Sequence, residues 1–520
     1  MLRSRYLLFI SLALLGLACS DDASSTPGAP DAMPPDTPMV DGGPTDGNDG
    51  GMSTPPDACV PAVCGADLCG TIDDGCGGTA TCGLSCNDPE SCGGGGEDNV
   101  CGCGEEVFSG TFTVNAATNF AVLAGVGRID GTLVVRNFPN EALDGLNCLS
   151  DITGNLILEQ NTALTSSTLL ANLRRVGGDV IIRNNAGLTD LGVVASLSQV
   201  GGLVLITGNS ALTSLDGLEQ LTSVGRDLRV EDHAALTDIS ALAGVTQLRD
   251  LRVINNDVLN DLTGLENIER LTGNLRIEDN DALVVLDALA AGAGTGLTDV
   301  DGSITIANNP SLDQIDGLAS VTQIGADLIV SGNAQLTSVD GMTGLTQIGG
   351  ELRLADNAAL TALDGLNALT SAQQVTIENN GLASLGGLNG LTSVTANVGS
   401  EAVTVSNNAA LTSIAGLTTL ATIDGRLRIE QNLLLTNIAG LAALRTIGGD
   451  LSVVANTALV SIESLLGLTE LGGDLSVTAN TSLPTCQADA LLAQVTANGF
   501  DGTAIISGND DAGVCGSAYR

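Results

Sequence analysis

One phrase recurs about every 24 residues, from near residue 130 almost to the C-terminus, and this period constrains the fold more than any other feature. The phrase is Gly-Gly, then x-Leu-x-Ile-x-x-Asn-x-x-Leu. A fixed period of this length indicates one supersecondary unit per repeat, with neighbouring units stacked into a solenoid. Two repeats carry Phe138 and His233 at the asparagine position, and the others carry Asn161, Asn185, Asn209, Asn256, Asn280, Asn309, Asn333, Asn357, Asn380, Asn408, Asn432, Asn456, Asn480 and Asn509.

The repeat over 348–369, IGGELRLADNAALTALDGLNAL, shows what one coil contains. Leu352 and Leu354 alternate with other residues, which predicts a strand with one buried face. Leucines then recur every third residue, which favours a tight coil of turns over an α-helix. Gly349 and Gly350 are predicted to supply unusual backbone angles. Each coil should therefore contribute one short parallel strand to an all-β-rich solenoid, a parallel β-helix or leucine-rich-repeat-like stack.

The asparagine of each repeat is predicted to be structural. An inward amide side chain can bond the backbone N–H and C=O groups of its own turn and the next, where no water reaches them. The asparagines would then form an internal ladder, with His233 as a substitute rung and no catalytic or metal-binding role.

Residues 128–485 resemble tandem receptor L-domain repeats, the leucine-rich-repeat-like coils of insulin- and EGF-receptor ectodomains and of many bacterial surface proteins. The resemblance rests on LTSVGRDLRVEDHAALTDI at 221–239 and LTQIGGELRLADNAALTALDGL at 345–366. It also rests on the four-residue step from Ile348 to Leu352, where a standard leucine-rich repeat has three. The resemblance implies a right-handed solenoid and a ligand- or partner-binding role, and it transfers no binding residues.

The first 19 residues resemble a lipoprotein signal peptide. Arg3 and Arg5 precede an apolar run that ends in Ala18-Cys19, as in a bacterial lipobox, although Gly16 stands where leucine is usual. Cys19 would carry the lipid, and the protein would be exported to the cell envelope, at the outer membrane or cell surface. The alternative is ordinary signal cleavage, which leaves Cys19 as a free thiol.

Two further segments precede the solenoid. Residues 20–57 are rich in Asp, Pro, Gly, Ser and Thr and are predicted to be a disordered acidic linker. Residues 58–104 hold nine cysteines and should form a disulfide-rich module, because the spacings do not suit zinc. The module resembles a cysteine-rich segment seen in secreted proteins of myxobacteria. The solenoid is assigned to 105–485 and a C-terminal cap to 486–520.

The number and positions of the cysteines predict two of the disulfide contacts. Without Cys19 there are twelve cysteines, and the nine in 59–103 cannot all pair with one another. Cys148 is the nearest remaining partner, so one bond is predicted to join the module to the first coils. Cys486 and Cys515 would close the far end.

The residue between the two inward positions of each strand should lie on an outer wall. There, adjacent rungs lie about 4.8 Å apart, so an exposed aliphatic patch and a neighbouring arginine column are predicted, partly neutralised by Glu231 and Glu278. These residues are the candidate binding face; the alternative is a solvated face whose aliphatic part the cysteine module covers. The patch comprises Val134, Ile157, Ile181 and Leu205, and the column Arg229, Arg252 and Arg276. The coils that lead to Asn309 and Asn408 are longer than the others, and their extra residues should form loops. These loops are a second candidate binding site; the alternative is that the extra residues are tolerated variation in coil length.

Charge and composition narrow the function. With 18 basic residues, all arginine, against 60 acidic ones, the net charge of −42 disfavours nucleic acid and anionic membranes as direct partners. The lack of lysine and the single histidine argue against an enzyme, a metal site and a cofactor. The expected function is a non-catalytic, lipid-anchored binding or adhesion scaffold for a protein or peptide ligand. The alternatives are a passive envelope spacer and a polysaccharide-acting β-helix enzyme; carbohydrate is disfavoured because the coils lack Trp and Tyr.

Overall fold

The structure is a computed structural model, and the predicted signal peptide, Cys19 and the linker lie outside the residues that it describes. Of the cysteine module it describes two short antiparallel pairs: β1 (Gly70–Asp73) with β2 (Thr79–Cys82), and β3 (Ser91–Cys92) with β4 (Cys101–Gly102). The described residues are 70–73, 79–82, 91–92, 101–103, 106–118, 120–123, 125–139, 146–165, 170–290, 296–397 and 399–515.

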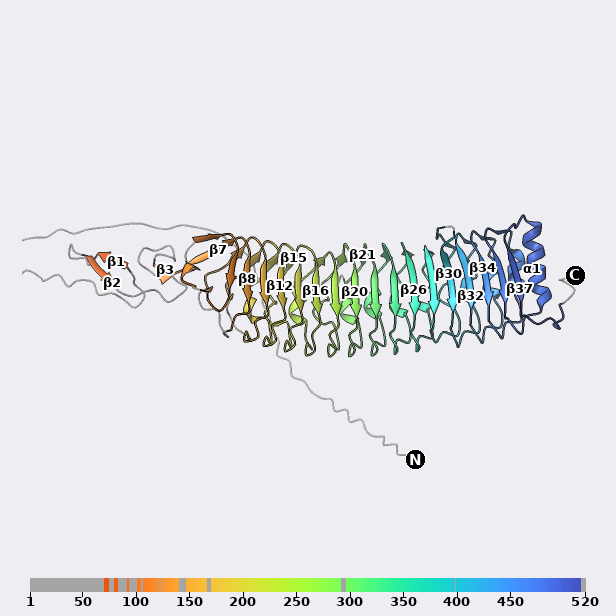
Figure 1. Cartoon of the computed structure of the whole chain (residues 1–520), viewed down its shortest axis with the longest axis horizontal. Coiled ribbons are helices and arrows are strands. Elements are labelled where there is room, and N and C mark those ends of the chain that lie inside the picture. The colour runs from red at the N-terminus through yellow and green to blue at the C-terminus, as the bar shows by residue number, and fades with distance from the viewer. Residues whose placement is uncertain are drawn as a thin grey trace, which may run out of the picture. The chain divides into compact units, whose positions relative to one another are not determined.

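The coils form a parallel β-solenoid, as predicted, and a long parallel sheet makes its main wall (Figure 1). Each strand pairs with the equivalent strand of the coils before and after it, in unbroken order from β6 to β37. The strands are β6 (Phe112–Val114), β8 (Leu133–Arg136), β10 (Leu156–Glu159), β12 (Val180–Arg183), β14 (Val204–Thr207), β16 (Leu228–Glu231), β18 (Leu251–Ile254), β20 (Leu275–Glu278), β22 (Ile304–Ala307), β24 (Leu328–Ser331), β26 (Glu351–Ala355), β28 (Gln374–Glu378), β30 (Glu401–Ser406), β32 (Arg426–Glu430), β34 (Leu451–Val454), β36 (Leu475–Thr478) and β37 (Ala504–Ser507).

Each coil also contributes a second strand, so the prediction of one strand per coil was wrong. The residues just before the Gly-Gly pair form these strands, most of them two residues long, which pair in parallel. They are β5 (Glu106–Ser109), β7 (Val126–Asp130), β9 (Asp151–Ile152), β11 (Arg175–Val176), β13 (Gln199–Val200) and β15 (Ser223–Val224) in one sheet, and β17 (Gln247–Leu248), β19 (Arg270–Leu271), β21 (Asp299–Val300), β23 (Gln323–Ile324), β25 (Gln347–Ile348), β27 (Ser371–Ala372), β29 (Ser393–Val394), β31 (Thr422–Ile423), β33 (Thr446–Ile447) and β35 (Glu470–Leu471) in another.

Short 3₁₀ turns complete many of the coils, in agreement with the three-residue leucine spacing. In the last coil an α-helix, α1 (Thr485–Ala497), replaces them and lies between β36 and β37 in the chain. No helix among the described residues is long and apolar enough to cross a membrane. The turns are η1 (Phe120–Leu123), η2 (Gly192–Val194), η3 (Ser240–Gly244), η4 (Asp287–Leu289), η5 (Asp316–Leu318), η6 (Asp340–Met342), η7 (Asp364–Leu366), η8 (Ala415–Leu417), η9 (Ala439–Leu441) and η10 (Glu463–Gly467).

A continuous aliphatic core runs through the stack of coils. Both inward strand residues of the coil at 348–369, Leu352 and Leu354, are fully buried. The leucines at three-residue spacing in the following turns are also buried, from Leu360 to Leu369. Because one coil cannot cover this surface alone, its stability depends on its neighbours.

The paired glycines allow close approach between coils, so the predicted unusual angles at Gly349 and Gly350 were wrong. Neither residue has a positive φ. A Cβ on Gly349 would lie 2.1 Å from the carbonyl oxygen of Gly325, and one on Gly350 would lie 2.2 Å from Oδ1 of Asp327. A side chain at either position would therefore force the coils apart.

The left-handed backbone conformation instead falls on the residue just before the ladder asparagine. This position has φ between 50° and 70°, which Asn, Asp and Gly adopt more readily than other residues. Its occupants are Asn137, Gln160, Asn184, Gly208, Asp232, Asn255, Asp279, Asn308, Gly332, Asp356, Asn379, Asn407, Gln431, Ala455, Ala479 and Gly508.

The asparagines form a hydrogen-bonded ladder inside the solenoid, with His233 at one of its positions. In the coil of Asn185, its Oδ1 accepts a hydrogen bond from the backbone N–H of Asn161, 3.0 Å away. Its Nδ2 donates to the carbonyl oxygen of Leu158 at 3.0 Å and to Oδ1 of Asn209 at 3.1 Å. The asparagine side chains therefore satisfy buried backbone groups of the preceding coil, and many of them also bond the side chain of the next rung.

A second ladder, not foreseen from the sequence, lies where the main-wall strands begin. The N–H of Asp179 donates to Oδ1 of Asn155 at 2.8 Å, and Oδ1 of Asp179 accepts from the N–H of Leu203 at 2.8 Å. The signal was the Asp or Asn that often follows the glycine pair. Its members are Asn155, Asp179, Asp250, Asn274, Asp327, Asp450 and Asp474.

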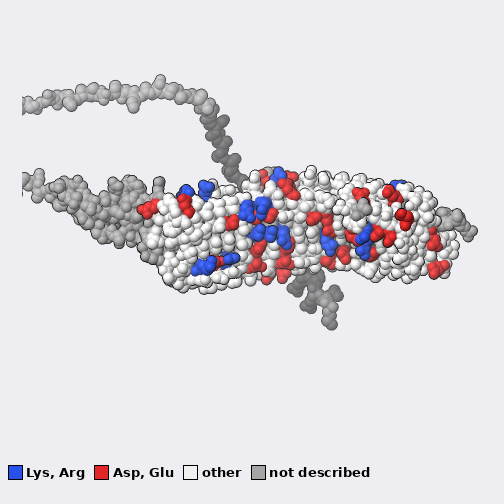
Figure 2. Space-filling view, turned by 45° about the horizontal axis from the view of Figure 1, so that its top comes forward, with Lys and Arg blue, Asp and Glu red and all other residues white. Residues whose placement is uncertain are grey.

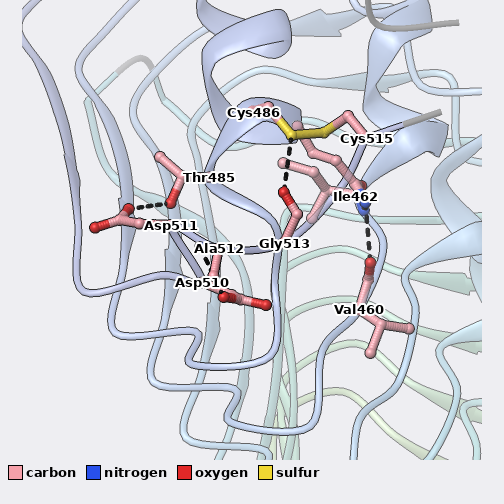
Figure 3. The surroundings of a disulfide bond; sticks show 10 residues. Val460, Ile462, Thr485, Cys486, Asp510, Asp511, Ala512, Gly513 and Cys515 are labelled. Carbon is pink, nitrogen blue, oxygen red and sulfur yellow. Dashed lines mark hydrogen bonds between the residues drawn. A yellow bond between two sulfur atoms is a disulfide. The ribbon is translucent and has the colours of Figure 1, made fainter. Parts of the chain in front are cut away.

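Two predicted disulfides are present, one near each end of the solenoid. Cys103 bonds Cys148, with their Cα atoms 5.1 Å apart, and Cys486 bonds Cys515, with a Cα separation of 6.2 Å. Figure 3 shows the second bond beside the start of α1. Gln487 of α1 ties the cap to the preceding coil: its Oε1 accepts from the N–H of Ile462, and its Nε2 donates to the Val460 carbonyl.

Candidate binding face

The main-wall strands bring the predicted face residues together in one line. Register pairs Val134 with Ile157, Ile157 with Ile181 and Ile181 with Leu205. The line continues from Leu205 through Arg229, Arg252 and Arg276 to Thr305. We call this line, from Val134 to Ile505, the central column. It was predictable because the strand period is two and every coil holds the same register.

The aliphatic part of the column is packed rather than exposed, which corrects the predicted patch. Val134 is 8% exposed and counts as buried, and the side chains of Ile157, Ile181 and Leu205 are half-buried. Large side chains at this spacing lie in contact with their column neighbours and cover one another. This part of the column therefore exposes less apolar surface than the predicted patch.

Each arginine of the column has an acidic neighbour in its own strand or just before it. Nη2 of Arg229 lies 3.1 Å from Oδ2 of Asp227, and Nε of Arg276 lies 2.6 Å from Oε1 of Glu278. Arg252 pairs more loosely with Asp250, at 3.9 Å. Glu278 thus pairs within its own strand rather than diagonally, and all three arginines of the column stand beside a carboxylate.

Asp227 holds this cluster together from a fully buried position. Its Oδ1 accepts from Nε of Arg249 at 2.7 Å, in addition to the Arg229 contact. Burial alone would raise the pKa of Asp227, but the hydrogen bonds and charges of Arg249 and Arg229 outweigh burial and lower it. The carboxylate is therefore ionised at neutral pH and fixes both guanidinium groups.

Two hollows lie on the same wall farther toward the C-terminus. One, of about 390 Å³, is lined by residues that include Arg353, Thr376, Thr404 and Arg428. The other, of about 270 Å³, is lined by residues that include Arg428, Ser452, Ser476, Thr503 and Ile505. We call them the threonine hollow and the serine hollow. On the face drawn in Figure 2, basic and acidic side chains gather in mixed clusters with uncharged surface between them.

The hollows arise from the size of the central-column side chains. Register aligns Thr376 and Thr404 between Arg353 and Arg428, and Ser452 and Ser476 between Arg428 and Ile505. Where small side chains stand between long ones, the wall is indented over two strands. This order of side chains is readable in the sequence, but the predicted face rested on the large residues of the column and did not include the small ones.

Glu401 stands between the two hollows and comes from one of the long coils. The longer connection before Asn408 leads into β30, whose pairing with β32 shifts register between Glu401 and Val403. Oε1 of Glu401 lies 3.4 Å from Nη1 of Arg428 and 3.7 Å from Nη1 of Arg426. The extra residues of that coil thus place an acid at the rim of both hollows. The residues 291–295 of the other long coil lie outside the described ranges.

The ionic groups of the hollows are engaged with one another. Arg428 bonds Glu430 at 2.8 Å, and Oε1 of Glu430 also accepts from the hydroxyl of Ser452 at 2.7 Å. Burial would raise the pKa of Glu430, but Arg428 and Ser452 lower it. Within the described part of the chain no group of three or more His, Cys, Asp or Glu side chains could hold a metal ion. The arrangement offers fixed donors and acceptors for polar contacts.

No model of a known protein family matches the chain, and no curated protein compared with it shows significant similarity. The resemblance to receptor L-domain repeats and that of the cysteine module therefore stay predictions. A proposal for the function of the main wall therefore rests on the geometry of the wall itself.

Proposed function

We propose that this protein is an exported, non-catalytic scaffold that holds a protein or peptide ligand on the C-terminal part of its main wall. It would be anchored in the envelope by a lipid on Cys19, with no direct contact to nucleic acid and with the membrane reached only through that lipid. The pair of hollows around Arg428 is the observation that carries the proposal.

The chemistry of the hollows suits polar groups of a peptide. Hydroxyl groups of Ser476, Thr404 and Thr503 line the hollows, and paired arginines and carboxylates stand at their rims. Backbone amides need both donors and acceptors, and such a lining offers both. Ile505, 56% exposed, adds an apolar contact at the end of the serine hollow. Arginine and indented surfaces are common where partners bind.

Export is supported by the covalent structure. Disulfides such as Cys486–Cys515 are typical of proteins that reside in oxidising compartments. The predicted lipobox agrees with export and adds the anchor. Mass spectrometry of the purified chain should find a diacylglyceryl group on Cys19, and a Cys19→Ala variant should leave the membrane fraction. An unmodified Cys19 would remove the anchor from the proposal while leaving the binding face untouched.

The binding face is tested by closing the serine hollow. The full-length protein is cross-linked in intact envelopes, and its partners are compared with those of Ser452→Arg/Ser476→Arg. Thr361→Arg, at an exposed position outside the main-wall strands, is the control. The proposal expects a partner that the control retains and the double variant loses, with both variants equally stable to heat. Equal recovery of a partner by all three proteins would mean that the partner binds away from the serine hollow, and no partner for any of them would favour the passive spacer.

The arginine column is tested in parallel as the face first predicted from the sequence. Arg229→Glu/Arg252→Glu/Arg276→Glu should leave the same partner bound, because these arginines are already ion-paired and half-buried. Loss of the partner in this variant without loss of thermal stability would move the binding face to the N-terminal half.

A further inference from the structure

The asparagine ladder is interrupted on both sides of His233. Elsewhere the backbone N–H of one rung donates to Oδ1 of the next, as from Asn161 to Asn185. At His233 the N–H donates instead to the carbonyl oxygen of Asn255, at 3.1 Å. Oδ1 of Asn256, which would accept that bond, is buried without a hydrogen-bond partner. On the other side, the imidazole offers no amide oxygen to the N–H of Asn209.

The interruption belongs to the histidine and not to the length of its coil. His233 precedes Asn256 by one residue less than the usual spacing, but so does Asn357 precede Asn380. There the N–H of Asn357 still donates to Oδ1 of Asn380, at 3.2 Å. A large ring is not the cause either, because the N–H of Phe138 donates to Oδ1 of Asn161 at 3.0 Å.

The imidazole of His233 is fully buried between two acceptors. Its Nε2 lies 3.2 Å from the carbonyl oxygen of Ile206, the position that a ladder Nδ2 would occupy, and its Nδ1 lies 3.3 Å from that of Asn209. A neutral imidazole has one N–H and can satisfy only one of these oxygens. A protonated ring would satisfy both, but it would place a charge inside an aliphatic core.

We propose that the coil of His233 is an acid-sensitive junction, which divides the solenoid into two stacks of coils that separate locally on mild acidification. The N-terminal stack ends at the rung of Asn209 and carries the aliphatic part of the central column, from Val134 to Leu205. The C-terminal stack begins at Asn256 and carries both hollows. In a solenoid each coil contacts only its neighbours, so one weak interface is enough to break cooperativity between the two stacks.

The direction of the pH effect follows from burial. Burial lowers the pKa of His233 more than its two carbonyl contacts and the charge of Asp232 raise it. The folded junction therefore holds a neutral ring, whereas an opened, hydrated ring protonates near the ordinary pKa of about 6.5. The junction has its full stability above that pH and loses stability as the pH falls below it, because the open state binds the extra proton.

Other charged groups near the ring do not reproduce this dependence. On its own coil they are Arg229, Glu231, Asp232 and Asp238, and on the following coil Arg252, Asp257 and Asp261; the preceding coil has none between residues 204 and 215. Carboxyl and guanidinium groups in general titrate outside the range from pH 7.5 to 5.5, and His233 is the only histidine of the chain. Asp232 bonds Nδ2 of Asn255 at 2.8 Å and helps hold the junction closed at either pH.

Hydrogen exchange on the full chain tests the junction. Amides around Asn209 and His233 are compared with those around Asn309 and Asn333 in the same sample, so that the intrinsic pH dependence of exchange cancels. Relative opening at His233 should exceed one at pH 7.5 and rise by up to about tenfold per pH unit below 6.5. His233→Asn, which restores the ladder, should abolish both the excess and its pH dependence. Equal exchange at the two places, or an excess that persists in His233→Asn, would overturn the proposal.

Two further measurements remove ambiguity. Because the chain has one histidine, selective ¹⁵N-histidine labelling gives its pKa and tautomer directly by NMR. A pKa at or above the ordinary value would overturn the proposal without any variant. Asn333→His places the same ring in an uninterrupted part of the ladder and should create a second acid-sensitive junction there. Unchanged exchange at Asn333 in a folded variant would count against the mechanism.

Discussion

The central column differs sharply between the two halves of the main wall. From Val134 to Arg276 it is filled by aliphatic side chains and ion-paired arginines, whereas from Thr376 to Ile505 small side chains leave two hollows. Both halves share the same strand spacing, inward leucines and asparagine ladder. The coil therefore determines a uniform scaffold, and one outward residue per strand determines the shape of the local surface.

The largest effect is expected when one ladder asparagine is removed beneath each half of the main wall. Asn185→Leu leaves the N–H of Asn161 and the carbonyl of Leu158 without their side-chain partner, and Asn432→Leu does the same to Asn408 and Val405. Each buried unsatisfied group costs about 1–3 kcal/mol, so each variant should lose about 2–6 kcal/mol of local stability. Hydrogen exchange measures this coil by coil. A large effect in only one half would show that the halves differ below the surface as well.

Removing the Cys486–Cys515 bond should loosen only the hollow half. A disulfide that closes a loop of 29 residues stabilises by about 2–4 kcal/mol, by constraining the unfolded chain. Cys486→Ser/Cys515→Ser should therefore speed exchange in α1 and β37, next to the serine hollow, and leave β10 to β14 unchanged. Faster exchange throughout the solenoid would contradict local closure and would mean that the cap controls the whole stack.

Two opposite substitutions test whether an open hollow lowers the stability of the protein. Ser476→Ile fills the serine hollow and should stabilise by about 0.2–1 kcal/mol through contacts with its column neighbours. Leu205→Ser opens a hollow in the filled half and should cost about 1 kcal/mol, because Leu205 is half-buried. Urea unfolding monitored by circular dichroism compares the two. Destabilisation by Ser476→Ile would mean that the hollow is required by packing and is not a free surface.

The smallest expected effect concerns one carboxylate in each half. Glu159 lies between Arg136 and Arg183, whose hydrogen bonds and charges lower its pKa, and Arg428 and Ser452 lower that of Glu430. Stability from these pairs is present above the ordinary carboxyl pKa and is lost as the pH falls through the lowered values. Glu159→Gln and Glu430→Gln should each cost at most about 1 kcal/mol at pH 7 and less at pH 3. A cost that grows on acidification would reverse the assigned sign.

The parts of the fold that repeat could be predicted from the sequence. Alternation at Leu352 and Leu354, the three-residue leucine spacing and the recurring asparagine each express a backbone requirement that every coil shares. The same regularity placed Val134 and Arg229 in one column, because register in a stack is inherited from coil to coil. Counting the cysteines predicted a bond from Cys148 to the cysteine module and the bond between Cys486 and Cys515, whereas only the structure identified Cys103 as the partner of Cys148.

The features that failed to be predicted depend on distances between coils. The need for Gly350 comes from the approach of Asp327, and the second strand of each coil forms only when neighbours supply partners. The exposure of Val134 and the pairing of Arg276 with Glu278 depend on rotamers that column neighbours impose. The interruption of the asparagine ladder at His233 was not predicted, because His233 keeps the register of the repeat and differs from asparagine only in its hydrogen-bonding groups.

A solenoid of stacked coils, with an aliphatic interior and an internal polar ladder, could be predicted from the sequence alone. The repeat that produces these features can be seen along the chain without knowledge of the contacts between coils. Only the tertiary structure decided where the outer wall is smooth, where it is hollow and where its ladder is interrupted. Those properties depend on how side chains of adjacent coils meet across a few ångströms, which no single repeat contains.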